Sequence, residues 1–386
     1  MFYNAALNRS ALAAYDRGLL WSIFALLGLG LVMVYSASIP IAEAKSASQQ
    51  PGFYLFRHAM YVGIGLAVGL ATFQVPTATW QKLAPLVFFL AALALALVLL
   101  PFIGKEVYGA RRWINLGPLG SFQPSELMKF ATILYAADYT VRKASHMDNV
   151  KKGFLPMFLV MLLVGALLLL EPDFGAFVVI VAIALGVLFL GGLNWRLFAG
   201  LIGLLAVGFI LLIWLSPYRM QRVTSYLNPW ADPLGSGYQL SNALIAFGRG
   251  EWFGLGLGES VGKLFYLPEA YTDFLLAVLG EELGFVGVVT VTALFAWLTW
   301  RAFSIGWQAA LMGRNFQALL AQGVGLWIGL QSFFNMGVNM GLLPTKGLTL
   351  PLMSYGGSGI VANCLALALL IRVDFENRCL MRGKKS

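Results

Sequence analysis

Acidic residues are scarce in this chain, yet four of them stand close together in the segment LPEAYTDFLLAVLGEELGFVG, residues 267–287. Glu269 and Asp273 come just before an apolar run, and Glu281 and Glu282 lie about two helical turns inside it. One interpretation of Asp273 is that it caps the helix that follows, because a carboxylate accepts hydrogen bonds from the free N–H groups of a helix start. Glu281 and Glu282 lie too deep to act as caps, so they predict a polar cleft in the protein.

A second ionisable pair lies in FQPSELMKF, where Pro124 precedes a helix that carries Glu126 and Lys129 on one face, three residues apart. One interpretation is an ion pair that neutralises itself and fixes the helix end. The other adds Arg112 and Trp113, a cation and an aromatic ring just outside the helix, and predicts a site for an anionic amphiphile. The sequence leaves both interpretations open.

Two short motifs carry further polar groups. In EPDFG, residues 171–175, Pro172 breaks a helix and Asp173 is placed to cap the next one. The Gly-Gly-Ser-Gly run at 356–359 permits close approach of the backbone and can direct N–H groups toward an anion, although such runs are common in loops. We interpret Asp173 as a cap and assign the glycine run no role by itself.

The elements that must position these side chains are membrane helices. Hydrophobic residues make up 59% of the 386 residues and charged residues only 11%, whereas a soluble domain has about a quarter of its residues charged. A spanning helix needs about 20 mostly apolar residues. We therefore predict an all-α polytopic membrane protein, one domain over 1–386, with about ten transmembrane helices at 18–38, 59–75, 84–103, 125–141, 154–171, 174–193, 196–215, 274–299, 316–341 and 358–372.

Basic residues predict the orientation of this bundle. Positive charge concentrates at 142–152 and in the C-terminal tail, which places both clusters and both termini in the cytoplasm. Residues 216–273 then form a large extracytoplasmic loop between helices 7 and 8, whose piece QLSNALIAF is expected as an amphipathic helix and whose aromatic residues favour an ordered cap. Cations on the outer side are not explained by orientation and as a group predict an anion site: Arg111, Arg112, Arg219, Arg222, Arg249, Lys263 and Lys346.

The cysteines predict no disulfide. Cys364 lies in the last helix and Cys379 beyond it, about 22 Å apart if the chain between them is helical.

The motifs GARRW, FQPSELMKF, EPDFG, ADPLGSGYQL, LPEAYTDF, GEELGFVG and LPTKGLTLPLMSYGGSG occur in the order and spacing of the SEDS family (shape, elongation, division and sporulation). The chain resembles this family from its first helix to its last. The stretch AFGRGEWFGLGLGES, together with the last motif, is most similar to the cell-division branch rather than the elongation branch.

The resemblance implies a peptidoglycan glycosyltransferase of the bacterial inner membrane that polymerises lipid II into β-1,4 glycan strands at the division septum. It also implies a class B penicillin-binding protein and other division proteins as partners, and no nucleic acid. In this family the acid of the TDF motif is essential, which is Asp273 here, and further family positions match Glu126, Lys129 and Lys346. One departure is Tyr271, where the family commonly has His.

Glycosyl transfer from a diphosphate lipid needs a general base and cations for the leaving group. We predict Asp273 as the base of an inverting reaction, and a divalent cation such as Mg²⁺ or Mn²⁺ as a further aid. No metal-ligand spacing in the sequence decides the question of the metal. The predicted substrate-binding residues are Arg112, Glu126, Lys129, Arg222, Arg249, Glu269, Lys346 and Ser354.

Two rival classes fit the composition. A transporter (flippase) of lipid-linked precursors would also have about ten helices with in-membrane charges, but such proteins usually show an internal repeat, and we find no convincing one. A scaffold that only recruits division proteins would leave the buried acids unexplained.

Overall fold

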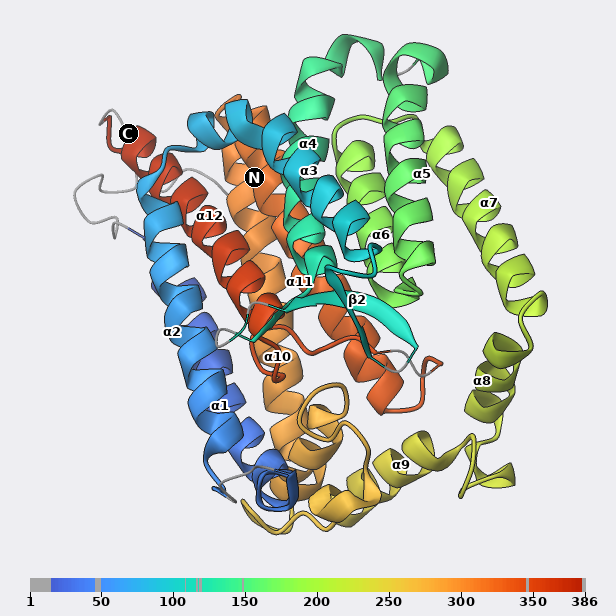
Figure 1. Cartoon of the computed structure of the whole chain (residues 1–386). Helices are drawn as coiled ribbons and strands as arrows, with labels where there is room; N and C mark the ends of the chain where they lie inside the picture. Colours follow the sequence, from blue (N-terminus) through green and yellow to red (C-terminus); the bar gives the residue numbers. More distant parts are fainter. Residues whose placement is uncertain are drawn as a thin grey trace.

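The computed structural model describes residues 15–45, 50–107, 109–115, 117, 120–147, 149–344 and 347–383. Each of the ten predicted ranges overlaps a helix (Figure 1), although α3 ends before the predicted 103 and α10 and α12 continue past the predicted 299 and 372. These helices are α1 (Arg17–Lys45), α2 (Phe53–Gln74), α3 (Thr77–Val98), α4 (Pro124–Arg142), α5 (Leu155–Leu170), α6 (Phe174–Leu190), α7 (Trp195–Trp214), α10 (Leu275–Leu311), α11 (Asn315–Asn339) and α12 (Gly357–Met381).

Six helical segments in the described part of the chain are long and apolar enough to cross a membrane: Arg17–Ala44, Phe53–Gln74, Thr77–Val98, Val150–Leu170, Leu275–Leu311 and Gly357–Met381. The fourth of these joins the short π-helix η3 (Val150–Phe154) to α5. Helix α6 and the segment Trp195–Gly208 of α7 are apolar but shorter. The protein is therefore a multi-pass helical membrane protein, and the count of ten crossings stays a prediction.

Small residues let the helices approach closely, as expected for a membrane bundle. Helix α2 packs against α12 through Gly65 and Gly69. A Cβ added to Gly65 would lie 2.9 Å from Sγ of Cys364, and one on Gly69 would lie 3.3 Å from the carbonyl oxygen of Cys364. Cys364 is buried in this contact, and both it and Cys379 are free thiols, as the sequence predicts.

The predicted cytoplasmic segments meet at one end of the bundle. Asp16 pairs with Arg301 and Arg378, and the residues before α1 thereby contact the far ends of α10 and α12. Arg314, between α10 and α11, pairs with Glu376 of α12. Figure 1 shows the end of α12 at this end and the long loop with α8 (Pro217–Leu227) and α9 (Tyr238–Gly250) at the opposite one.

A small antiparallel sheet departs from the all-α prediction. After α3, the chain forms β1 (Gly104–Val107), β2 (Ala110–Asn115) and β3 (Ser121–Phe122) in the order β1-β2-β3. Ile114 lies opposite both Gly104 and Phe122. The strands are short and lack an alternating apolar pattern, so hydropathy alone could not reveal them. The sheet places Arg112 beside the start of α6.

The long loop is ordered, and QLSNALIAF does form a helix, α9. Helix α9 packs against α10, and this contact buries Leu240, Ala243 and Ala246. Beyond α9, the chain runs along a break in α10 at Gly284, whose φ of 68° favours glycine. There Leu255 and Gly256 donate backbone hydrogen bonds to the carbonyl groups of Glu281 and Glu282. The 3₁₀-helix η4 (Pro229–Ala231) and π-helix η5 (Gly262–Tyr266) complete the loop.

Candidate active site

Asp273 lies in the turn just before α10, and its backbone is fixed by two side chains of α11. The amide groups of Asn335 and Asn339 both donate to the Asp273 carbonyl at 2.9 Å. Asn339 also accepts from the N–H of Ala277 at 3.2 Å, a donor that it shares with the carbonyl of Phe274, so α11 contacts the first turn of α10. The position of the acid is therefore set by two buried asparagines that the sequence analysis did not identify.

The capping interpretation of Asp273 is wrong. The N-cap position of α10 is Phe274, with no side-chain cap hydrogen bond. Thr272 does not cap the helix either, because its hydroxyl donates to Glu269, at 2.7 Å from Oε2. No described residue donates a hydrogen bond to the Asp273 carboxylate. This carboxylate therefore has acceptor capacity for a substrate hydroxyl.

The carboxylate of Asp273 lies against the loop between α11 and α12. A Cβ added to Gly347 would lie 3.0 Å from Oδ2 of Asp273, so a side chain at this position would crowd the acid. Asn335 ties the two segments together, since its amide also donates to the carbonyl of Leu348 at 2.6 Å. The LPTKG motif and the TDF motif, far apart in sequence, thus meet at the carboxylate.

Burial and neighbouring charges move the pKa of Asp273 to about 7, from an ordinary value of 3.8. Burial has the largest effect, because it disfavours the charged form. The carboxylate of Glu269 raises the pKa further and Asp173 does so to a smaller extent, while the Arg112 guanidinium lowers it. Asp273 therefore exchanges its proton near neutral pH, as a general base requires.

The EPDFG turn holds Arg112 in place. Its Nε donates to the carbonyl of Glu171 at 3.1 Å, and a terminal nitrogen donates to the carbonyl of Pro172. Asp173 caps α6 as predicted, because its Oδ1 accepts from the N–H of Ala176 at 3.2 Å. Its Oδ2 accepts from the hydroxyl of Ser125 at 2.9 Å, which joins this turn to the start of α4.

Glu171 is a buried acid that the sequence analysis did not single out. Its side chain is fully buried, and neither carboxyl oxygen has a hydrogen-bond partner among the described residues. Burial and the nearby Asp173 raise its pKa to about 8, against the effect of Arg112, which lowers it. The sequence did contain a signal for this residue, because Glu171 is an acid at the end of an apolar helix. The sequence analysis passed over it because the cap at Asp173 already explained the polar residues of this turn.

Glu126 and Lys129 form the predicted ion pair, with Nζ of Lys129 2.7 Å from Oε1 of Glu126. Lys129 is fully buried and also donates to Oε1 of Gln331 at 2.8 Å. Gln331 in turn donates to the carbonyl of Thr349 at 2.9 Å and accepts from Trp327 at 2.8 Å. The pair thus joins α4 to α11 and to the loop that contacts Asp273, and Lys129 has no exposed surface.

Glu281 and Glu282 hold the long loop, and Glu281 also lines a small pocket there. Both are fully buried. Glu282 pairs with Lys263 at 2.8 Å and accepts from Ser36 of α1 at 2.6 Å. Lys263 is consequently a buried partner of an acid and not a free outer cation.

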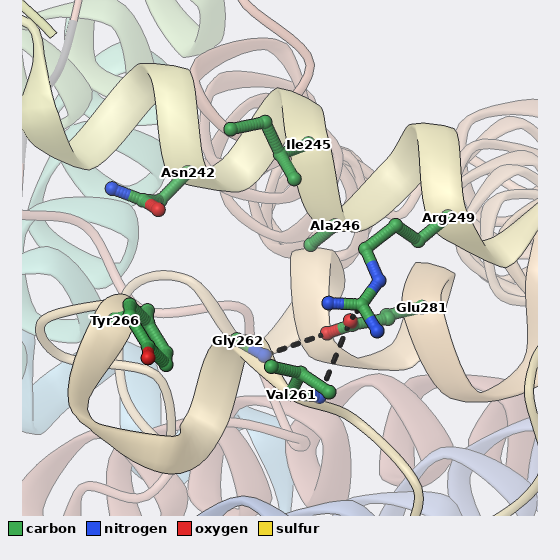
Figure 2. A pocket seen from close by; sticks show the side chains of 8 residues that line it. All are labelled: Asn242, Ile245, Ala246, Arg249, Val261, Gly262, Tyr266 and Glu281. Carbon is green, nitrogen blue, oxygen red and sulfur yellow. Dashed lines mark hydrogen bonds and ion pairs between the residues drawn. The ribbon is translucent and has the colours of Figure 1, made fainter.

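Glu281 accepts from Ser260 and from the backbone N–H groups of Val261 and Gly262, and pairs with Arg249 at 3.4 Å. Figure 2 shows Glu281 and Arg249 at the wall of a small pocket of about 190 Å³ between α9 and η5. Arg249, 42% exposed, is the predicted cation that reaches this pocket.

The remaining predicted site residues have different positions. Glu269 adopts a φ of 55° and is partly buried in the turn that carries Asp273. The hydroxyl of Ser354 is buried and accepts from the N–H of Leu350 at 2.9 Å, within its own turn. Lys346 lies outside the described residues, as does the side chain of Arg222. Tyr271 packs against Tyr54 and Tyr355, with ring centroids 4.9 and 5.5 Å away.

The divalent cation stays a prediction. Across the described ranges, no group of three or more His, Cys, Asp or Glu side chains is arranged to hold a metal ion.

Fold and site together define a multi-pass membrane protein in which a partly buried carboxylate, with a pKa near neutrality, lies near an arginine of the small sheet at one end of the bundle. Comparison with known proteins gives the family. The FtsW, RodA and SpoVE family, described as "Cell cycle protein", matches residues 17–379, and the chain belongs to it.

Named relatives and solved structures agree with this assignment. The "Probable peptidoglycan glycosyltransferase FtsW" of Aromatoleum aromaticum is 62% identical over 97% of this chain and 91% of its own length. The protein of the same name from Burkholderia thailandensis is 58% identical over 98% of this chain and 82% of its own length.

Among solved structures, a chain from the study "Structural coordination of polymerization and crosslinking by a peptidoglycan synthase complex" is 32% identical, with a TM-score of 0.76 over 95% of this chain and 99% of that one. The Thermus thermophilus rod shape determining protein RodA is 29% identical, with a TM-score of 0.67 over the same shares.

Proposed function

We propose that this protein is a peptidoglycan glycosyltransferase that polymerises lipid II into β-1,4 glycan strands during septal wall synthesis in cell division. The names of its relatives support the glycosyltransferase activity and the division role. The peptidoglycan synthase complex among its structural neighbours supports a cross-linking partner, which we expect to be a class B penicillin-binding protein. The active end then faces away from the cytoplasm, and both termini lie inside.

Asp273 acts as the general base in this proposal. An acceptor hydroxyl attacks the anomeric carbon of the donor sugar, the bond from that carbon to the diphosphate breaks, and the hydroxyl proton passes to the Asp273 carboxylate. Attack opposite the leaving group inverts the anomeric centre, from an α-linked donor to a β-linked product. The observation that carries this role is that the Asp273 carboxylate caps no helix and faces Gly347, while its backbone is fixed by Asn335 and Asn339. Burial, which raises its pKa to about 7, suits it to take up a proton near neutral pH.

Cations neutralise the departing diphosphate, which takes the bonding electrons. Arg112 is held by the EPDFG carbonyl groups close enough to lower the pKa of Asp273, and its other N–H groups are available to an oxyanion. We assign the same task to Arg249, Arg222 and Lys346. Lys129 and Glu126 contribute by fixing the loop above them, because their pair is buried, and Glu269 and Ser354 shape the two loops at the acid.

The test is polymerisation of lipid II by the purified protein with its transpeptidase partner. Asp273→Asn should reduce the rate by about 10²-fold or more, the usual contribution of a general base. Asp232→Asn is the matched control, since Asp232 is an exposed acid of the same loop region that bonds only to its own turn. A folded Asp273→Asn variant that made glycan at the wild-type rate would refute the assignment.

A further inference from the structure

The first turn of α12 has unused hydrogen-bond donors. Helix α12 begins in the run Gly356-Gly357-Ser358-Gly359, and no side chain caps it. Among the described residues, none accepts a hydrogen bond from the N–H groups of Gly357, Ser358 or Gly359. The three glycines of the run are partly exposed. The free N–H groups of a helix start carry a partial positive charge and attract an acceptor.

Contacts from three other elements fix the position of this turn. The hydroxyl of Ser358 accepts from the N–H of Gln123 at 2.9 Å and donates to the carbonyl of Ser121 at 3.3 Å, which attaches the turn to β3 and to the start of α4. Gly357 packs against Tyr61 of α2, since a Cβ on this glycine would lie 2.8 Å from the tyrosine ring. The free donors are therefore held in place before any ligand arrives.

An unused acceptor lies beside these donors. Oε1 of Glu126 pairs with Lys129, but Oε2 has no hydrogen-bond partner among the described residues, although Glu126 is only 8% exposed. A Cβ built on Gly359 would lie 3.7 Å from this oxygen and 3.8 Å from Oγ1 of Thr349. Buried polar groups are nearly always satisfied, by protein, water or a ligand.

Gly359 leaves a space between these groups. Its φ lies outside the left-handed region, and a Cβ at this position would make only ordinary van der Waals contacts. Neither the backbone conformation nor the packing therefore requires a glycine, and a glycine inside a helix costs about 0.5–1 kcal/mol relative to alanine. The space is bordered by the free N–H groups of α12, by Oε2 of Glu126 and by the partly exposed Thr349.

The polar groups around this space select an amide as ligand. The N–H groups of α12 need an acceptor and Oε2 of Glu126 needs a donor, and an amide supplies both from one rigid plane. A phosphate offers acceptors and would bring its negative charge against the carboxylate of Glu126.

The space lies within reach of a sugar that reacts at Asp273. Gly347 contacts the Asp273 carboxylate, and Thr349 follows two residues later, at most about 7 Å along the chain. The donor sugar of lipid II carries an N-acetyl group on the carbon next to its anomeric carbon. A donor that is attacked beside Asp273 therefore has its amide close to the start of α12.

We propose that the first turn of α12, Glu126 and Thr349 form a subsite for the N-acetyl group of the donor sugar. The N–H groups of the turn and the hydroxyl of Thr349 donate to the acetyl carbonyl, and Oε2 of Glu126 accepts from the amide N–H. This inference rests on the proposed glycosyltransferase function and adds the contact by which the enzyme distinguishes an N-acetylated donor.

Equilibrium binding to the Asp273→Asn protein, which lacks the proposed base, tests the subsite without turnover. The probes are lipid II and an analogue in which a hydroxyl group replaces the acetamido group on the sugar that carries the diphosphate. Microscale thermophoresis in detergent gives the two dissociation constants. The analogue should bind about tenfold more weakly, because it leaves Oε2 of Glu126 and the N–H groups of α12 without their partners.

Two substitutions in the same background probe the protein side. Gly359→Ala fills the space with a methyl group and should weaken binding of lipid II about tenfold, although alanine suits a helix better and the protein should melt no earlier. Thr349→Val keeps the shape of the side chain, removes the hydroxyl and should weaken binding about fivefold. Both losses should be less than about twofold for the analogue, since it lacks the acetyl group that these residues contact.

Matched controls place the same changes elsewhere. Gly63→Ala is on an exposed face of α2, where a Cβ meets nothing within 4 Å, and Thr290→Val removes an exposed hydroxyl that bonds only to its own helix. Both should bind lipid II like the parent protein.

Three results would overturn the subsite and leave the glycosyltransferase function intact. These are equal binding of lipid II and the analogue, an unchanged dissociation constant in Gly359→Ala, and an equal loss of both ligands in Gly359→Ala, which would place the diphosphate at this turn. Wild-type protein that showed the expected binding differences but made no glycan with its partner would instead refute the function and leave the subsite intact.

Discussion

At the scale of single residues, Asp273 differs from the other acids of its segment because no residue in the described part of the chain donates a hydrogen bond to its carboxylate. Glu281 and Glu282 are fully buried and accept hydrogen bonds from the long loop and from α1. Asp273 instead faces Gly347, while its backbone is fixed by Asn335 and Asn339. A fixed backbone with an uncommitted carboxylate is the arrangement expected of a catalytic base.

The pH dependence of polymerisation follows from the raised pKa of Asp273. A base must be ionised to accept a proton, so the rate should increase through about pH 7 and level off above it. Glu269→Gln removes a negative neighbour and should move the midpoint to lower pH. Arg112→Gln removes a positive neighbour and should move it to higher pH. The measurement is the initial rate of glycan formation against pH, and midpoints that both stay in place would show that another group controls the rate.

At the scale of elements, the Glu126 and Lys129 pair connects α4 to α11 and to the loop near Asp273. Removing one partner leaves a buried charge uncompensated, which costs about 3–5 kcal/mol, whereas removing both avoids that penalty. We therefore expect Glu126→Gln and Lys129→Met each to lower stability or activity more than the double change does.

Thermal unfolding of the four proteins in detergent measures this coupling. Glu106 and Arg111 in the sheet are the control, because their side chains are 55% and 40% exposed and such pairs contribute little. Additive losses at Glu126 and Lys129 would show that the two residues act separately.

At the scale of the whole molecule, Asp16 ties the start of α1 to the ends of α10 and α12. Its backbone N–H donates to Asp374 at 2.8 Å, and its carboxylate pairs with Arg301 and Arg378. Burial raises the pKa of Asp16, but the N–H of Leu19, which donates to its Oδ1 at 2.8 Å, and the two arginines outweigh burial and hold this pKa below its ordinary 3.8. The stabilisation is therefore present above about pH 4 and is lost as the pH falls through the lowered pKa.

Asp16→Asn should destabilise the protein by about 1.5–3 kcal/mol at neutral pH, the contribution of hydrogen bonds to charged groups. The loss should shrink in acid. Melting curves at neutral and acidic pH check both effects, with Glu43→Gln, an exposed acid of α1, as the control. A melting temperature of Asp16→Asn equal to that of the wild type would contradict this role.

Much of the architecture was predictable because long apolar runs have few alternatives to helices in a membrane. The ion pair at Glu126 and the cap at Asp173 followed from spacing of three residues and from a helix break. The sheet after α3 was missed, since its strands are short and carry no alternating pattern. Asn335, Asn339 and Gln331 were missed because each is an isolated polar residue in an apolar helix, and its partner lies elsewhere in the chain.

The sequence by itself determined where the apolar helices lie along the chain, though not their exact ends, and, through its motifs, the resemblance to one family. Those properties depend on local composition and order along the chain. Only the tertiary structure decided which acids form hydrogen bonds or ion pairs inside the protein, because their donors come from distant segments of the chain. It assigned Glu281 and Glu282 to the long loop and buried the Glu171 carboxyl with no hydrogen-bond partner among the described residues. It also left the Asp273 carboxylate facing Gly347 near Arg112.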